Sequence, residues 1–402
     1  METPAPDTQG RLLEGVRVLD LAKLIPGAAA AGALAALGAD VVRVEQPTGT
    51  YLRRVPPLVH GVSLLSAALD AGKRSVAMQV EHPDAAAVLL RLAARADVIV
   101  ESGRPGVMEH WGLDGAALAA DGKVVVHLSA FGRDGPLSTL PGHGLNLDGV
   151  AGLAFSRPDG AVAPGWMPVS VLAGPMFAAQ AACAALFRRE RTGAGAELDV
   201  SCSEAGLVWQ QFLGAPLWNP DVTEYSPLHS PPRAKYSIYE TSDGRRMIFC
   251  AIEPRFFASF CRAAGRVDLA DADAPNADAE FDFANHDAAL RAELEALFRT
   301  RTLEEWVAVC VAADVAVGPA YEPAELATVP QHLARDAIRT VVVPGGGEIR
   351  VPAWPIRAVG EPPPRCDKVP DVGEHTTLAL SEAGFTQTEI DDLRSRAVIS
   401  GT

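Results

Sequence analysis

Short apolar segments alternate with helix-forming segments along the first third of the chain. Residues 16–21 and 41–44 are expected to be strands, and the alanine-rich run 28–37 between them is expected to be a helix. The order strand, helix, strand describes a parallel crossover unit. The pattern recurs in a helix over 82–94 and in strands over 98–100 and 123–128. This alternation predicts an α/β fold whose large domain is a doubly wound, Rossmann-like sheet.

Ligands of such sheets bind beyond the carboxyl ends of the strands. The loops that follow Leu21, Val44, Val100 and Leu128 are therefore expected to form the walls of a binding site.

Composition limits the class of protein. The 402 residues are 48% apolar and 21% charged, which predicts a sizeable core and at least two domains. A net charge of -15 argues against a nucleic-acid partner, although local basic clusters can still bind a small anion. The six cysteines form no CxxC pair, so no metal site is expected. The polar N-terminus and the lack of any apolar run approaching about 18 residues predict a cytoplasmic protein that does not bind membranes.

The second half of the chain is expected to carry a smaller domain. A helix over 173–191 and a strand over 197–201 close a large domain of residues 1–220, and a proline-rich linker follows over 221–235. A hairpin and two helices then predict a small α+β domain over residues 236–330. The hairpin strands are expected over 236–240 and 247–252, and the helices over 254–264 and 303–313. Residues 331–402 are expected to return to the large domain.

His143 is the leading candidate for proton transfer. It lies between Gly142 and Gly144, shortly after a Gly135-Pro136 turn, where neighbouring side chains shield it little. Imidazole has an ordinary pKa of about 6.5 and exchanges protons near neutral pH. The same residue type also occurs in turns without any catalytic role. The sequence has no GxGxxG, P-loop, GxSxG or HExxH pattern, which disfavours the dinucleotide, nucleotide, serine hydrolase and zinc peptidase classes.

Six segments in this order resemble the class III CoA-transferase family, also called the CaiB/BaiF family. They are Gly15–Asp20, Leu37–Glu45, Lys73–Ser75, Arg104–Val107, Phe131–Pro136 and Arg189–Gly193. The surroundings of His143, together with Tyr239–Gly244 and Ala251–Phe256, look most similar to the alpha-methylacyl-CoA racemase branch. The resemblance implies an interlocked, ring-like homodimer that binds a CoA thioester and needs no metal.

The resemblance also implies roles for individual residues. Arg43, Lys73, Arg74 and Arg104 match positions that hold the phosphates or adenine of CoA, and Ser102 belongs to the same CoA-binding group. Clustered cations suit such a polyanionic ligand. His143 matches the proton-transfer histidine of the racemases, and Glu253 matches a glutamate that reaches the site from the small domain.

The chain departs from the family pattern where the catalytic aspartate is expected. Counting back from the helix places the transferase acid at Val171 and the racemase acid at Ser170, and neither residue is a carboxylate. Valine cannot form the acyl anhydride of a transferase, and serine is a poor base. Asp148, five residues after His143, would substitute if the backbone turned it inward; otherwise it is a capping or solvated acid.

Three hypotheses remain. The first is racemase-like chemistry at the α-carbon of an acyl-CoA, carried out by His143: isomerisation, epimerisation or an enolate-driven rearrangement. The second is CoA transfer between an acyl-CoA and a carboxylate at a rearranged site. The third is a scaffold that binds thioesters without catalysis.

Overall fold

The computed structural model describes residues 11–154, 167–211, 214–219, 221–222, 233–272, 280–284, 287–359 and 366–402. The chain forms two compact units. Unit 1 comprises Met1–Gln210 and Leu333–Thr402, and unit 2 comprises Gln211–His332. Most of the linker predicted over 221–235 lies outside the described residues.

Unit 1 contains a seven-stranded sheet in the order β14-β5-β2-β1-β6-β7-β8. All neighbours are parallel except the terminal pair β14 and β5. The strands are β1 (Arg17–Asp20), β2 (Asp40–Glu45), β5 (Arg74–Met78), β6 (Val98–Glu101), β7 (Val124–Ser129), β8 (Ala196–Ser201) and β14 (Ile399–Ser400). The chain moves outward from β1 through β2 and β5, and then resumes on the other side of β1 with β6. The parallel, doubly wound sheet is therefore confirmed, and its switch point lies between β1 and β6.

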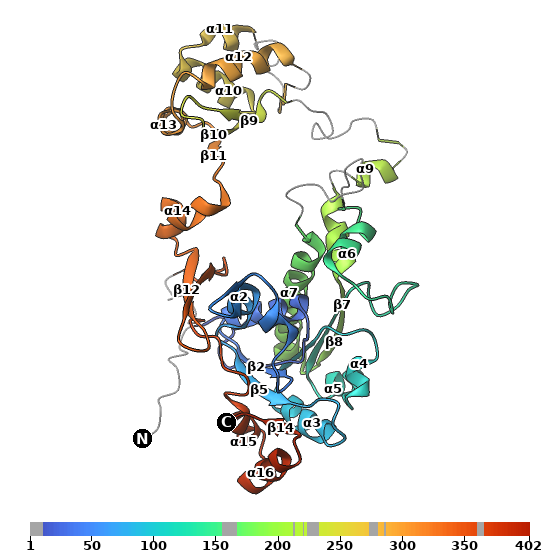
Figure 1. Ribbon diagram of the computed structural model, residues 1–402. Coiled ribbons are helices and arrows are strands. Elements are labelled where there is room, and N and C mark those ends of the chain that lie inside the picture. Colours follow the sequence, from blue (N-terminus) through green and yellow to red (C-terminus); the bar gives the residue numbers. More distant parts are fainter. Residues whose placement is uncertain are drawn as a thin grey trace. The chain divides into compact units, whose positions relative to one another are not determined.

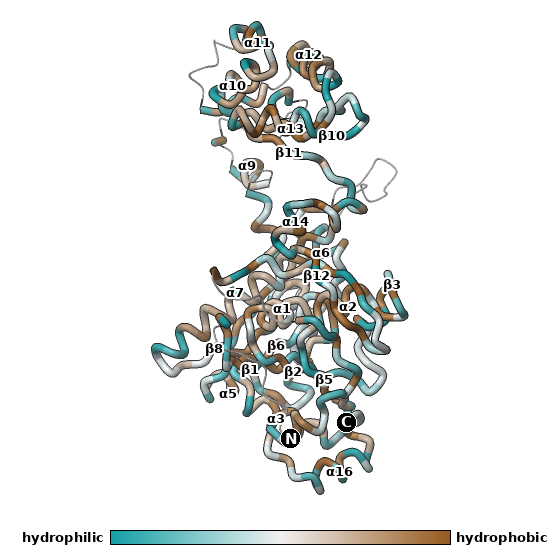
Figure 2. Tube along the Cα trace, turned by 90° about the vertical axis from the view of Figure 1, so that its left-hand side faces the viewer, coloured by the Kyte–Doolittle hydropathy of each residue, from teal (hydrophilic) through white to brown (hydrophobic). Residues whose placement is uncertain are grey.

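Helices cover both faces of this sheet. On one face, α1 (Ile25–Ala36) and α7 (Val169–Thr192) bury alanine, valine and leucine side chains against the strands. On the other face, α3 (Ala85–Arg95), α15 (Thr376–Glu382) and α16 (Gln387–Ser395) pack against a second core. Hydrophobic residues accumulate around α1 and the strands in Figure 2. Helix α1 begins before the alanine-rich run, and Pro26 lies within its first turn, where proline is tolerated because that N–H has no partner in the helix.

Shorter elements complete unit 1. Its hairpins pair β3 (Leu58–Val59) with β4 (Val62–Ser63), and β12 (Ile338–Val342) with β13 (Glu348–Pro352). The remaining helices are η1 (Tyr51–Arg54), α2 (Leu64–Asp70), α4 (Val107–His110), α5 (Gly115–Ala120), α6 (Gly144–Val150) and α8 (Cys202–Leu207), with η2 (Val208–Gln211) at its edge. The C-terminal segment lies against unit 1, since β14 pairs with β5 through Ile399 and Met78. Figure 1 shows this red segment beside the blue strands.

Unit 2 is an antiparallel three-stranded sheet with helices packed on it. The strands are β9 (Tyr236–Glu240), β10 (Arg246–Cys250) and β11 (Val317–Pro319). Its helices are α9 (Ala215–Trp218), α10 (Pro254–Ala264), α11 (Val267–Ala272), α12 (Ala288–Phe298), α13 (Leu303–Ala312) and η5 (Pro323–Thr328), and α14 (Pro330–Ala334) spans its boundary with unit 1. The rings of Phe249, Phe260, Phe298 and Trp306 pack against one another in its core. The predicted hairpin and both predicted helices are present.

Helix α7 corrects one expectation from the sequence. Its 24 residues are long and apolar enough to cross a membrane by length and composition, whereas no such run was expected. Of the apolar window, 56% is buried within the protein. Gly174 and Gly206 allow this burial, because a Cβ atom at Gly174 would lie 2.6 Å from Sγ of Cys202 in α8, and one at Gly206 would lie 2.1 Å from Oγ of Ser170.

Candidate active site

A cavity of about 430 Å³ opens in unit 1 at the switch point of the sheet. Its walls come from the loops after β1, β2, β6 and β7, the four loops that the sequence singled out. The lining residues include Leu24–Pro26 after β1, Tyr51 after β2, Ser102–Arg104 after β6, Leu128–Ala130 at the end of β7, and residues of the loop from Ser138 to Leu147. Tyr51 and Pro26 were not singled out from the sequence, although both follow strands whose loops were.

His143 lines this cavity at the N-terminal end of α6 and is exposed. Two hydrogen bonds of the Asn146 side chain hold the backbone of its loop. The backbone N–H of His143 donates to Oδ1 of Asn146 at 2.6 Å, and Nδ2 of Asn146 donates to the carbonyl of Pro141 at 3.1 Å. The imidazole is therefore accessible to a ligand on a loop whose backbone is held.

Gly142 is required for this placement. A Cβ atom at residue 142 would lie 2.4 Å from Cβ of Ala130, which follows β7, and 3.1 Å from a methyl group of Leu147. No side chain fits at that distance without a shift of the backbone. The glycine thus lets the histidine loop pack directly on the carboxyl end of the sheet.

Asp148 lies inside unit 1, and its contacts are those of a helix cap. Its side chain is fully buried, and its carboxylate accepts hydrogen bonds from the backbone N–H groups of Val169 and Ser170 at 3.2 and 2.8 Å. These N–H groups belong to the first turn of α7, and the N-cap residue Pro168 has no side chain that could accept their hydrogen bonds. The backbone does turn Asp148 inward, as the substitution hypothesis required, but toward α7 and not to the cavity lining.

Ser170 and Val171 point in different directions from α7. Ser170 is buried against Gly206 of α8, and its hydroxyl has no hydrogen-bond partner among the described residues. Val171 is 9% exposed and lines the cavity. The position at which the sequence comparison placed the transferase aspartate therefore does face the candidate site, and an apolar side chain occupies it.

The described residues that line the cavity include no aspartate or glutamate. Cys202 is the one thiol among them, and burial raises its pKa to about 12, so it stays protonated near neutral pH. Leu24, Ile25, Leu140 and Val171 give the cavity an apolar lining. His143 is the lining side chain best suited to accept a proton.

Arg104 and Ser102 lie on the loop after β6 and line the same cavity as His143. The carboxylate of Glu101 accepts a hydrogen bond from the backbone N–H of Gly103 at 2.6 Å and contacts Nδ1 of His127 at 2.8 Å. The hydrogen bond from Gly103 fixes the start of the loop. Arg104 is exposed, and its guanidinium is available for an anionic ligand.

Arg43 and Lys73 are placed otherwise than expected. Both are buried, and they form a closed ion-pair group with Asp20 and Asp70. Nζ of Lys73 lies 2.8 Å from Asp20 and 3.2 Å from Asp70, and Arg43 pairs with Asp70. Burial alone would lower the pKa of Arg43, but Asp70 and its other acidic neighbours raise it. The expected contact with CoA phosphates needs correction, because the charges of both cations are already neutralised within the fold.

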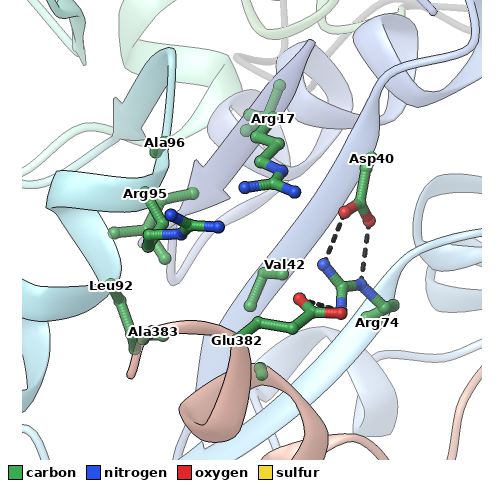
Figure 3. A pocket seen from close by; sticks show the side chains of 12 residues that line it. Arg17, Asp40, Val42, Arg74, Leu92, Arg95, Ala96, Glu382 and Ala383 are labelled. Atoms are coloured by element: carbon green, nitrogen blue, oxygen red, sulfur yellow. Dashed lines mark hydrogen bonds and ion pairs between the residues drawn. The ribbon is translucent and has the colours of Figure 1, made fainter. Parts of the chain in front are cut away.

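Arg74 is also turned away from the cavity. It begins β5, at the amino edge of the sheet, opposite the carboxyl edge that holds His143. Nε of Arg74 donates to Asp40 and Nη1 to Glu382, each at 2.8 Å, as the dashed lines of Figure 3 show. Of the four cations that the resemblance assigned to CoA, the structure places Arg104 alone on the cavity wall.

Glu253 belongs to unit 2, where it precedes α10 and is half-buried. It is the second cause, after burial, that raises the pKa of the neighbouring Cys250. Its predicted role beside His143 stays a prediction.

Comparison with known proteins shows the family of the chain. A model of CoA-transferase family III matches residues 13–376. The chain belongs to CoA-transferase family III. Alpha-methylacyl-CoA racemase of Mus musculus is 30% identical over 96% of this chain and 97% of its own length. Acetyl-CoA:oxalate CoA-transferase of Acetobacter aceti is 29% identical over 86% of this chain and 89% of its own length.

The solved structures agree on the fold. A CaiB/BaiF family protein from Brucella suis has a TM-score of 0.74 at 25% identity, and the match covers 93% of this chain and 100% of that one. By their names, one of these two relatives is a racemase and the other a CoA-transferase, and both act on CoA thioesters.

Proposed function

We propose that the protein catalyses racemase-like chemistry at the α-carbon of an acyl-CoA, with His143 as the proton-transfer residue. The observation that carries this proposal is the cavity lining, in which His143 stands among apolar side chains with no described carboxylate. A thioester makes the α-proton acidic enough for an imidazole base, and a relative at 30% identity is named as an alpha-methylacyl-CoA racemase.

The chemical step is a proton transfer in two directions. A ring nitrogen of His143 takes the proton from the α-carbon, and the electron pair of that C–H bond moves into the thioester to form an enolate. Return of a proton to the α-carbon restores the thioester. If the proton comes back from the same face, the substrate exchanges hydrogen with solvent and keeps its configuration. Inversion needs a second acid on the opposite face.

CoA transfer is the alternative, and the cavity disfavours it. Transfer through an acyl anhydride requires a carboxylate that attacks the thioester. Val171 faces the cavity at the position where the sequence comparison placed that carboxylate. The fully buried carboxylate of Asp148 accepts hydrogen bonds from the backbone of α7. The described part of unit 1 thus presents no nucleophile of the required kind at this site.

Other residues of the cavity wall are suited to bind the CoA and acyl parts of the substrate. Arg104 is an exposed cation at the site, suited to a phosphate of CoA. The apolar side chains of Leu24, Ile25, Leu140 and Val171 suit the hydrocarbon part of an acyl group.

The chain is also proposed to work as a homodimer. Leu172 and Met176 are one turn apart on α7 and are 47% and 44% exposed. Leu207 and Trp209, at and just beyond the end of α8, are exposed as well. Apolar side chains on neighbouring helices are typical of a surface that another chain covers. Sedimentation equilibrium tests this proposal, with a monomer as the contradicting result.

The function is tested by incubating the protein with a 2-methylacyl-CoA in deuterated water. Mass spectrometry should detect deuterium at the α-carbon of the recovered thioester. In parallel, hydroxylamine is added during incubation with acyl-CoA and a free carboxylic acid. No hydroxamate should form on the protein. Trapping of an anhydride on any carboxylate, without α-exchange, would favour CoA transfer, and the absence of both would favour a non-catalytic thioester-binding scaffold.

A further inference from the structure

A small hollow of about 30 Å³ lies at the amino edge of the sheet, opposite the edge that holds His143. Three arginines line it: Arg17 at the start of β1, Arg74 at the start of β5 and Arg95 at the end of α3. Figure 3 shows the guanidinium groups of Arg17 and Arg95 directed into this hollow. The floor between them is apolar and includes Val42 and Leu92.

The carboxylates around the hollow already have partners. Asp40 and Glu382 both pair with Arg74. Asp97, which precedes β6, accepts the backbone N–H of Arg17 at 2.9 Å and pairs with Arg189 at 3.0 Å.

Arg17 and Arg95 are left uncompensated by this pairing. Within the described residues, neither guanidinium takes part in an ion pair or a side-chain hydrogen bond. Two cations that share a hollow repel each other, and the repulsion is relieved when an anion binds between them. This local excess of positive charge stands out in a chain whose net charge is -15.

We propose that Arg17 and Arg95 form a binding site for a small tetrahedral oxyanion, phosphate or a terminal phosphate monoester, at the amino edge of the sheet. Guanidinium groups present paired N–H donors that match the oxygens of such an anion. The hollow has room for one or two water-sized groups, which suits an anion with part of its oxygens in solvent. Arg74 completes the wall but is neutralised by Asp40 and Glu382.

The bound anion would join two parts of the chain, and a third lies beside it. Arg17 belongs to the first strand, Arg95 ends α3, and Glu382, held by Arg74, ends α15 of the C-terminal segment. The site lies at the edge of the sheet opposite the cavity, so the proposal goes beyond the proposed function and does not rest on it.

The test is calorimetric titration of the full chain with inorganic phosphate at constant ionic strength, with chloride as the balancing anion. Wild type should bind phosphate saturably, and Arg17→Gln/Arg95→Gln should bind at least tenfold more weakly. Arg335→Gln/Arg350→Gln removes the same charge at exposed positions elsewhere and should leave the affinity unchanged. Adenosine 5′-monophosphate forms a second arm: binding as tight as that of phosphate indicates a monoester, and weaker binding indicates the free ion.

Wild type without saturable binding, or equal weakening in both double variants, would overturn the site. Thermal unfolding in phosphate-free buffer gives an independent check. There Arg17→Gln/Arg95→Gln should melt no lower than wild type, because the substitutions remove a repulsion and no attractive pair. A lower melting temperature would show that the two arginines already have partners within the protein.

Discussion

Asp148 and Ser170 are joined by a hydrogen bond of 2.8 Å from the backbone N–H of the serine to the carboxylate of the aspartate. Both residues were candidates for proton chemistry on the basis of the sequence, and their contact belongs to the start of α7. The bond fixes the first turn of the helix, in which Ser170 faces α8 and Val171 faces the cavity. The candidate active site is thus apolar on the side where a carboxylate was expected.

Loss of this cap should destabilise unit 1. Asp148→Ala leaves the N–H groups of the half-buried Val169 and the buried Ser170 without their acceptor, and we expect a loss of about 1–3 kcal/mol in the free energy of unfolding. Chemical denaturation measures it. Asp134→Asn, at an exposed loop position, is the control and should change little. Unchanged stability in Asp148→Ala would contradict the capping role.

A methyl group at Gly142 should displace the histidine loop. Because a Cβ atom there would lie 2.4 Å from Cβ of Ala130, Gly142→Ala is expected to lower the rate of α-proton exchange by about tenfold or more. Gly149→Ala, in the same loop–helix region, adds a methyl group where nothing lies within 4 Å and should exchange at the wild-type rate. Equal rates in the two variants would show that the loop does not depend on the close contact.

Arg104 and Arg43 should respond differently to substitution. Arg104→Gln is expected to weaken binding of an acyl-CoA and to reduce the salt dependence of that binding, with an unchanged melting temperature, because its guanidinium is exposed at the cavity. Arg43→Met leaves the buried Asp70 without its strongest partner, and we expect a loss of about 3–5 kcal/mol in stability. Calorimetry and thermal unfolding distinguish the two effects. Weaker CoA binding by a folded Arg43→Met protein with wild-type stability would restore the CoA contact that the sequence predicted.

Acid should destabilise unit 1 through its buried carboxylates. Burial alone would raise the pKa of Asp70, but Arg43 and Lys73 outweigh it and hold the pKa below its usual value. The pKa of Glu45 is lowered as well. Burial would raise it, but the hydrogen bond and the charge of Arg53 outweigh burial. A carboxyl group whose pKa is lower in the folded state stabilises the fold above its unfolded pKa of about 4, and the contribution is lost as pH falls through the folded value. Urea denaturation should therefore show a steep loss of stability below about pH 4. A smaller acid dependence is expected for Glu45→Gln, and an identical one would contradict this assignment.

The sequence predicted the fold well because its signals are local. Apolar strands, alanine-rich helices and the turn at Asp243-Gly244 each depend on neighbouring residues, and a Gly244 φ of 71° fits that turn. The strand β5 went unrecognised because Arg74 and Ser75 interrupt its apolar pattern and are satisfied by partners far away in the chain, such as Glu382.

The candidate site was predicted in part, for a different reason. The wall loops and His143 follow from strand order, since carboxyl ends of parallel strands meet at one edge. The placement of the cations does not follow from strand order. Arg43, Lys73 and Arg104 look alike in a sequence, and long-range contacts with Asp20 and Asp70 decide which of them is buried. The capping role of Asp148 likewise depends on a partner 22 residues away.

The most direct test of the account is α-proton exchange by His143→Gln. Wild type and the variant are incubated with the same 2-methylacyl-CoA in deuterated water, and deuterium at the α-carbon is followed by mass spectrometry. Because His143 is exposed, the variant should keep its melting temperature, and loss of the base should slow exchange by about a hundredfold or more. His110→Gln, at another exposed position, should exchange at the wild-type rate. Exchange retained in His143→Gln would contradict the proposed role of His143.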